Sequence, residues 1–302
     1  MVHEYAERVT NGRWNSSRFS VVLVTCVMLA VGRVLQALPE GKDVWGVTSL
    51  NNLIYVLRGK TSQQISVYDV DSYRLQRRIN VPRLNDMCDM VACLYYQCLY
   101  ISGGSDKCVH RVALQNGDVT KWLVNDEPAR LSVTDTHSVL VTCDEVRKII
   151  EFSTDGKLLR EIQLPQDVTS PCHTVQLSNG QFIVCHGGPN DPVHRVCLVG
   201  SDGHVVASYG GPVGSGSQQM NVPCHLAVDE NGFVFVADTN NYRVLLLSPE
   251  LTYVRDVVSR DQLKWSPLIM FLHAQRHRLY IADNKWENEE YTAGRVVIVS
   301  LV

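Results

Sequence analysis

Two histidines stand in identical Pro-Cys-His triplets, and they are the clearest candidates for chemistry in this chain. His173 follows Pro171 and Cys172, and His225 follows Pro223 and Cys224. A neutral imidazole can ligate a metal ion or exchange a proton near neutral pH. What the two histidines can do together depends on the elements that carry the triplets.

The triplets recur because the chain is built from repeated units. Four units begin at a proline and two earlier units lack it: Pro128, Pro171, Pro223 and Pro267, with earlier starts near Trp45 and Asp89. Each unit shows a short apolar strand, a polar turn and further strands, and the Asn-Gly turns at 179–180 and 231–232 are strong hairpin signals. Six units of about 40 to 50 residues predict an all-β, six-bladed β-propeller of four-stranded antiparallel blades.

The sixth unit lacks a fourth strand, because the sequence ends directly after its third. Residues 32–39 are similar in pattern to the fourth strand of another unit at 156–165. We therefore expect a strand from Val34 to Leu38 to close the last blade. The predicted domains are an N-terminal extension, residues 1–31, and a propeller, residues 32–302.

The start of each innermost strand faces the mouth of the central channel in a propeller. His173 and His225 occupy this position in two blades, and Asp89 and Arg130 stand at equivalent positions in two others. These four residues are the channel-mouth candidates. Two imidazoles and the Asp89 carboxylate could hold a divalent metal, but Arg130 would repel a cation. We therefore expect hydrogen-bonded histidines, no metal and no cofactor, with the metal site as the alternative.

The best-preserved unit resembles the NHL-repeat family. It reads Pro223-Cys-His-Leu-Ala-Val-Asp229, then Gly232-Phe-Val-Phe-Val-Ala-Asp238, then Asn240-Asn-Tyr-Arg-Val244. Ala282-Asp283-Asn284 with Arg295 is similar to a second copy, and the resemblance covers residues from about 44 to the C-terminus. In the similar tripartite-motif proteins an NHL propeller selects targets for an attached ubiquitin-ligase module, whereas this chain shows no RING-type Cys/His spacing, B-box or heptad run. NHL-type amidating lyases instead use channel histidines to hold zinc.

Arginines and acidic residues recur with the repeat. The arginines predicted to precede third strands are Arg111, Arg195, Arg243 and Arg295, and the residues that accompany them are Asp238, Asn240 and Asp283. A guanidinium can form two hydrogen bonds with a carboxylate. Because the spacing follows the repeat, we expect a structural brace in these blades, in preference to a basic binding ring.

The ten cysteines contain no C-x2-C pair, which argues against a zinc ribbon. Cys143 and Cys185 are predicted to occupy the position that Ala237 fills in the best-preserved unit. A site that accepts alanine suits a small buried thiol. We therefore expect reduced, buried cysteines, with disulfides as the alternative in a secreted protein.

Charge and the N-terminus bear on partners and location. The net charge of −3 argues against a nucleic-acid platform, so RNA binding is disfavoured. The apolar run from Val21 to Val31 is either a targeting segment or a buried strand, and a membrane becomes a partner only if this run is an anchor. A cytoplasmic location is favoured, with secretion or membrane anchoring as the alternative.

The function expected from these features is that of a non-enzymatic protein-interaction scaffold. Its protein partners would bind the loop rims, and target recognition in a ubiquitin-ligase-type assembly would be one such role. The sequence shows no Gly-rich phosphate loop, no G-x-S-x-G and no H-E-x-x-H motif. Two alternatives stay open: a metal-dependent lyase or hydrolase with its site in the channel, and a secreted or membrane-anchored propeller.

Overall fold

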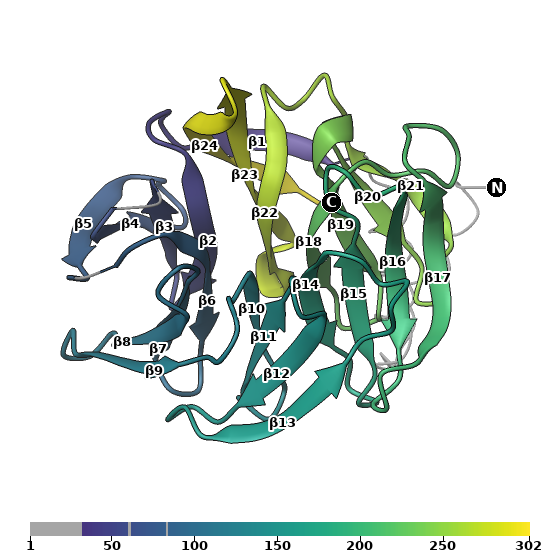
Figure 1. The fold of residues 1–302 in the computed structure, drawn as a ribbon. Coiled ribbons are helices and arrows are strands. Elements are labelled where there is room, and N and C mark those ends of the chain that lie inside the picture. The colour runs from purple at the N-terminus through teal and green to yellow at the C-terminus, as the bar shows by residue number, and fades with distance from the viewer. Residues whose placement is uncertain (1–31, 60–61, 83) are drawn as a thin grey trace, which may run out of the picture.

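Six four-stranded antiparallel sheets form a ring around a central axis (Figure 1). The computed structural model describes residues 32–59, 62–82 and 84–302. The first strands of the six sheets contact one another in a closed cycle, which makes them the innermost strands. The prediction of a six-bladed β-propeller is confirmed. The apolar run from Val21 to Val31 lies outside the described residues.

Blades 1 to 5 are meanders whose strands follow chain order from the innermost to the outermost position. Blade 1 holds β2 Val44–Leu50, β3 Leu53–Arg58, β4 Gln64–Asp69 and β5 Leu75–Asn80. Blade 2 holds β6 Met87–Cys93, β7 Cys98–Gly103, β8 Cys108–Ala113 and β9 Val119–Leu123. Blade 3 holds β10 Arg130–Val133, β11 Val139–Cys143, β12 Lys148–Phe152 and β13 Leu158–Gln163. Blade 4 holds β14 Pro171–Gln176, β15 Phe182–His186, β16 Val193–Val199 and β17 Val205–Pro212. Blade 5 holds β18 Pro223–Val228, β19 Val234–Asp238, β20 Arg243–Leu247 and β21 Tyr253–Val258.

Blade 6 joins the two ends of the described chain. It consists of β22 Ser266–His273, β23 Arg278–Glu287 and β24 Glu290–Ser300, with β1 Arg33–Ala37 paired antiparallel on β24. Leu38 extends this pairing, since its N–H donates to the carbonyl of Val296 over 2.8 Å. The expected closing strand from Val34 to Leu38 is therefore confirmed, although the observed strand begins and ends one residue earlier.

A β-bulge marks the start of the innermost strand in five of the six blades described. The register shifts once in each of them, between Val44 and Gly46, Met87 and Asp89, Pro171 and His173, Pro223 and His225, and Pro267 and Ile269. A bulge inserts one extra residue and re-aims the side chains beside it. In each of these blades the bulged residue directly precedes the channel-mouth position of the innermost strand.

Apolar side chains pack between adjacent blades and form the core. One cluster joins blades 6 and 1 through Val47, Ile269 and Tyr280, and others follow around the ring. Gly46 permits the close approach of blade 2, since a Cβ there would lie 2.5 Å from the Cβ of Met90. The only helices among the described residues are the 3-10 turns Thr239–Asn241 and Ala274–Arg276. No helix in this part of the chain is long and apolar enough to cross a membrane.

Candidate functional site at the channel mouth

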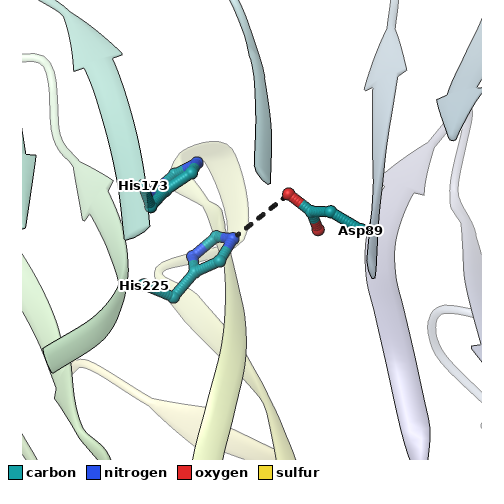
Figure 2. A group of neighbouring side chains, drawn as sticks. All are labelled: Asp89, His173 and His225. Atoms are coloured by element: carbon teal, nitrogen blue, oxygen red, sulfur yellow. Dashed lines mark ion pairs between the residues drawn. The ribbon is translucent and has the colours of Figure 1, made fainter. Parts of the chain in front are cut away.

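The four channel-mouth candidates lie at one level of the ring. Each candidate lies on the innermost strand of its blade and pairs with the penultimate residue of the second strand. The four are Asp89 on β6, Arg130 on β10, His173 on β14 and His225 on β18. All four side chains are buried. Figure 2 shows Asp89 pointing across the channel toward the two histidine rings. The structure thus gathers residues from four blades into one cluster.

Asp89 and His173 satisfy backbone groups at the edges of the innermost strands. Each of these strands has a hydrogen-bonded neighbour on only one side, so its channel edge leaves N–H and C=O groups without a sheet partner. Asp89 accepts hydrogen bonds from the N–H groups of Met90, at 2.8 Å, and Leu131, at 2.9 Å. His173 bridges the carbonyl of Leu131, at 3.0 Å, and the N–H of Leu226, at 3.1 Å. These bonds tie blades 2 to 5 together.

The contacts of His173 define its tautomer. The N–H of Leu226 donates to Nδ1, so Nδ1 carries no proton and Nε2–H donates to the carbonyl of Leu131. Burial, followed by the neighbouring His225, holds the pKa of His173 well below its ordinary value. His173 is therefore a neutral ring with both nitrogens engaged.

His225 has one nitrogen to spare. Its ring stacks on His173, with the centroids 3.9 Å apart and the planes at 16°. Its Nε2 lies 3.8 Å from Oδ2 of Asp89, and its buried Nδ1 has no hydrogen-bond partner among the described residues. Burial raises the pKa of Asp89, but the nearby His225 and the charge of Arg130 outweigh it and leave that pKa below its usual value. An ionised carboxylate thus faces one nitrogen of an imidazole whose other nitrogen is buried and has no hydrogen-bond partner among the described residues.

Arg130 is the charged member of this cluster contributed by blade 3. Its Nη1 donates to the carbonyl of Cys88, its guanidinium lies 6.0 Å from the ring centroid of Trp45, and its buried Nε has no partner among the described residues. Burial opposes its charge, but Cys172, Asp89 and Cys224 raise the pKa of Arg130 above its ordinary value. Arg130 is a fixed positive charge with one donor unused.

Several residues of the mouth were missed by the sequence reasoning. The bulged residues Cys172 and Cys224 lie beside Arg130, and Tyr291 of β24 lies close to both thiols. Tyr291 makes an edge-on contact with Trp45, with the ring centroids 5.5 Å apart. The repeated Pro-Cys-His triplet was a signal for the two cysteines. No local pattern points to Tyr291, because the long hairpin of blade 6 brings it to the mouth.

The donor set does not favour a metal ion. Asp89, His173 and His225 each offer a ligand atom, all within 4.8 Å of one another. Zinc binds imidazole through a nitrogen lone pair at about 2 Å, and both nitrogens of His173 are engaged with backbone groups. The buried charge of Arg130 acts on Asp89 and His173 and would repel a cation. The arrangement suits proton transfer better than metal binding.

The repeated acidic residues and arginines lie on the outer side of the channel cluster. Nε of Arg243 donates to Asp238 and Nε of Arg295 donates to Asp283, each over 2.8 Å, and both carboxylates are fully buried. Asp238 also accepts from the N–H of Asn221 at 2.7 Å. These contacts join the second and third strands of blades 5 and 6 to the connections that precede those blades. Asn240 lies outside this pair and hydrogen-bonds Asn221 through its side chain.

One repeat assignment differs from the structure. Arg195 pairs in register with His186, so it shares the position of Arg243 as predicted, although its carboxylate partner is the exposed Asp167 at 3.8 Å. Arg111 lies in the middle of β8, opposite Tyr100, and is not equivalent to the other arginines. The third strand of blade 2 is too divergent in sequence to show that Arg111 is offset from the position of Arg243.

The predicted position of Cys143 is also wrong by one residue. Cys143 pairs with Lys148, as Asp238 pairs with Arg243, whereas Cys185 shares the position of Ala237. Cys143 and Cys185 are nevertheless buried, and the nine cysteines of the described residues are free thiols.

Comparisons with known proteins identify the fold and no family. Virginiamycin B lyase from Staphylococcus aureus is 10% identical over 87% of this chain and 99% of its own, with a TM-score of 0.60. Kuenenia stuttgartiensis hydrazine synthase is 13% identical over 83% and 95%, with a TM-score of 0.58. The propeller domain of Cps50 (Swd1) from Myceliophteria thermophila is 9% identical over 90% and 100%, with a TM-score of 0.61. No protein-family model and no curated protein matches the chain.

These similarities define the chain as a six-bladed β-propeller. They also correct the functional expectation. The prediction of a non-enzymatic interaction scaffold was wrong. Solved structures that share this architecture include a lyase and a hydrazine synthase, so a propeller fold does not indicate a non-enzymatic role. At these identities the likeness extends to the fold alone, so it transfers no activity to this chain.

Proposed function

We propose that the channel mouth is an acid–base site at which His225 exchanges a proton with a small-molecule ligand. The observation that carries the proposal is the buried His225, with Nε2 facing the Asp89 carboxylate and Nδ1 without a partner among the described residues. A carboxylate that orients one side of an imidazole and stabilises its charged form leaves the other nitrogen to act as a base. The reaction class is a lyase-like or hydrolase-like proton abstraction.

The neighbouring residues have distinct roles in this proposal. His225 takes the proton at Nδ1, and Asp89 stabilises the imidazolium that forms. Arg130 supplies a buried positive charge and an unused Nε–H donor that would favour negative charge developing on the ligand. His173, whose nitrogens are both occupied, is a positioning residue that stacks on His225. No metal is needed for any of these steps.

Virginiamycin B lyase is the similar structure that bears on a role for histidine. A solved structure of that enzyme with quinupristin carries a catalytically inactive histidine-to-alanine variant, with 10% identity to this chain and a TM-score of 0.59. A propeller can therefore support chemistry that depends on a histidine. The substrate of this chain is a separate question that its own residues must answer.

A substrate panel tests the proposal. Wild-type protein is incubated with chromogenic esters, lactones and β-elimination substrates in the presence of a chelator. We expect turnover that falls by about 10² to 10⁴-fold in His225→Gln, the usual contribution of a general base, and that also falls in Asp89→Asn. His204→Asn, at a side chain that is 84% exposed, is the matched control. Full activity in His225→Gln, loss of activity with the chelator, or no turnover by the wild type would contradict the proposal.

We propose further that the blades are NHL-type repeats. The support is the match of motif to structure in blades 5 and 6, where Asp238 pairs with Arg243 and Asp283 with Arg295. The likeness to the propellers of tripartite-motif proteins rests on these same motif residues. A crystal structure of this chain superposed on NHL propellers, with these two pairs out of register, would contradict the assignment.

Propeller domains commonly mediate protein interactions, and one rim of this chain offers a surface for a protein partner. The turn between β6 and β7 exposes Leu94, Tyr95 and Tyr96, with 62%, 67% and 40% of their surface accessible. Tyr95 stacks on His137 of the next blade, with the ring centroids 4.4 Å apart, which fixes the two rings in place. Tyrosine is enriched at protein interfaces. Cross-linking at Tyr95, replaced by a photoreactive residue, should capture a protein, and capture equal to that from the exposed control position Val206 would contradict this role.

A further inference from the structure

Cys172 and Cys224 occupy the same bulge in consecutive blades. Each is the extra residue at the start of its innermost strand, between Pro171 and His173 on β14 and between Pro223 and His225 on β18. The two strands lie against each other, and the next residues along them, His173 and His225, stack at 3.9 Å. The two thiols accordingly belong to adjacent strands, at equivalent positions beside the stacked histidines.

The surroundings of this thiol pair favour one thiolate. Cys224 belongs to the apolar cluster that joins blades 6 and 1, Cys172 packs against this cluster, and both interact with the charge of Arg130. The neighbouring Cys172, followed by the charge of Arg130, lowers the pKa of Cys224, whereas Cys224 and burial raise the pKa of Cys172. Cys172 is partly exposed and Cys224 is buried. The pair therefore combines a thiol of lowered pKa, Cys224, with a thiol that solvent reaches, Cys172.

We propose that Cys172 and Cys224 form a redox-active dithiol that is oxidised to an inter-blade disulfide by hydrogen peroxide. The Cys224 thiolate attacks one peroxide oxygen, becomes a sulfenic acid and releases hydroxide, which takes up a proton to leave as water. The Cys172 thiol then attacks the sulfenic sulfur, the S–S bond forms, and a second water leaves. Two thiols and one peroxide thus give one disulfide and two waters, with two electrons passing to the peroxide.

Arg130 distinguishes this pair from a metal site and from the other close pair of thiols. Its guanidinium stabilises a thiolate but would repel a bound cation. Cys93 and Cys98 are also adjacent, as directly opposed residues of β6 and β7, but 1% and 0% of their surfaces are exposed. Peroxide in solution therefore reaches the pair at the channel mouth first.

Peptide mapping of the folded protein tests the proposal. Full-length protein is reduced, exchanged into buffer at pH 7, treated with hydrogen peroxide, blocked with iodoacetamide and digested without reductant. We expect one linked peptide pair, Cys172 with Cys224, an intact mass lower by two hydrogens, and reversal by dithiothreitol. Circular dichroism before digestion verifies that the propeller is intact.

Variants separate the roles of the two thiols. In Cys172→Ser the disulfide is lost and Cys224 accumulates as a sulfenic acid that dimedone labels, whereas Cys224→Ser gives no dimedone label at Cys172. Cys197→Ser, at a buried thiol whose pKa burial raises to about 12, is the matched control and leaves the linked peptide unchanged. A linked Cys93–Cys98 peptide in its place, or no linked peptide in folded oxidised protein, would overturn the proposal. Neither result would bear on the His225 activity measured in reductant.

Discussion

Acid should destabilise this propeller through two histidines that are buried in the neutral form. Burial holds the pKa of His173 well below its ordinary value, and it lowers that of His186 to about 4. In the unfolded chain both titrate near the ordinary value of about 6.5. As the pH falls from 7.5 to 5.5, the unfolded chain binds a proton at each position and the folded chain does not. The free energy of unfolding is therefore lower at pH 5.5 than at pH 7.5 by about 1.4 kcal/mol per histidine, or about 3 kcal/mol in total.

Urea denaturation at the two pH values, followed by tryptophan fluorescence, measures this difference. His186→Asn keeps a donor for the carbonyl of Thr169, which Nδ1 of His186 contacts at 3.2 Å, and removes one titrating ring. We expect its free energy of unfolding to fall by about 1.4 kcal/mol less than that of the wild type. His204→Asn is the exposed control for the substitution itself. A free energy of unfolding that stays constant or rises as the pH falls from 7.5 to 5.5 would show that the two histidines are not held neutral in the folded protein.

Two other perturbations test the scaffold. Arg243→Met leaves the Asp238 carboxylate buried without its charge partner, so the free energy of unfolding in urea should fall by about 3 to 5 kcal/mol. Arg195→Met removes only an exposed contact of 3.8 Å and should cost less than about 1 kcal/mol; equal effects would contradict the distinction. Deletion of residues 1–38 removes β1 and leaves β24 with an open edge. The shortened chain should be cleaved faster by protease within blade 6, and cleavage at the wild-type rate would show that β1 does not close the ring.

The fold could be predicted from the sequence because the repeat is a local signal. Proline, a short apolar strand and an Asn-Gly turn recur at regular spacing, and the Asn-Gly turns place Gly180 and Gly232 at φ +84°, a conformation that glycine adopts readily. The closing strand could be inferred because the last unit lacked a fourth strand and residues 32–39 matched the pattern of the fourth strand at 156–165. The offset of Arg111 escaped detection because blade 2 lacks both the leading proline and a terminal aspartate.

The site could be predicted only in part. The triplets placed His173 and His225 at the mouth, and equivalence between units added Asp89 and Arg130. The hydrogen bonds that distinguish the two histidines depend on which backbone edges face the channel, and no pattern within one unit encodes that. The proposed thiol pair likewise depends on a bulge, which recurs at Cys172 of one blade and at Cys224 of the next. Contacts between blades are long-range properties, and a single sequence carries little direct signal for them.

The central claim is that Asp89 holds His225 with Nδ1 free to accept a proton. Long-range ¹H–¹⁵N correlation spectra of the histidine rings, recorded at neutral pH, measure it directly, with His225→Gln identifying the resonances. We expect His225 to carry its proton on Nε2, facing Asp89, and Nδ1 to have the ¹⁵N shift of an unprotonated nitrogen. We expect the same tautomer for His173, which Asp89→Asn leaves unchanged. A proton found on Nδ1 of His225, with Nε2 unprotonated, would show that Nδ1 is not the base.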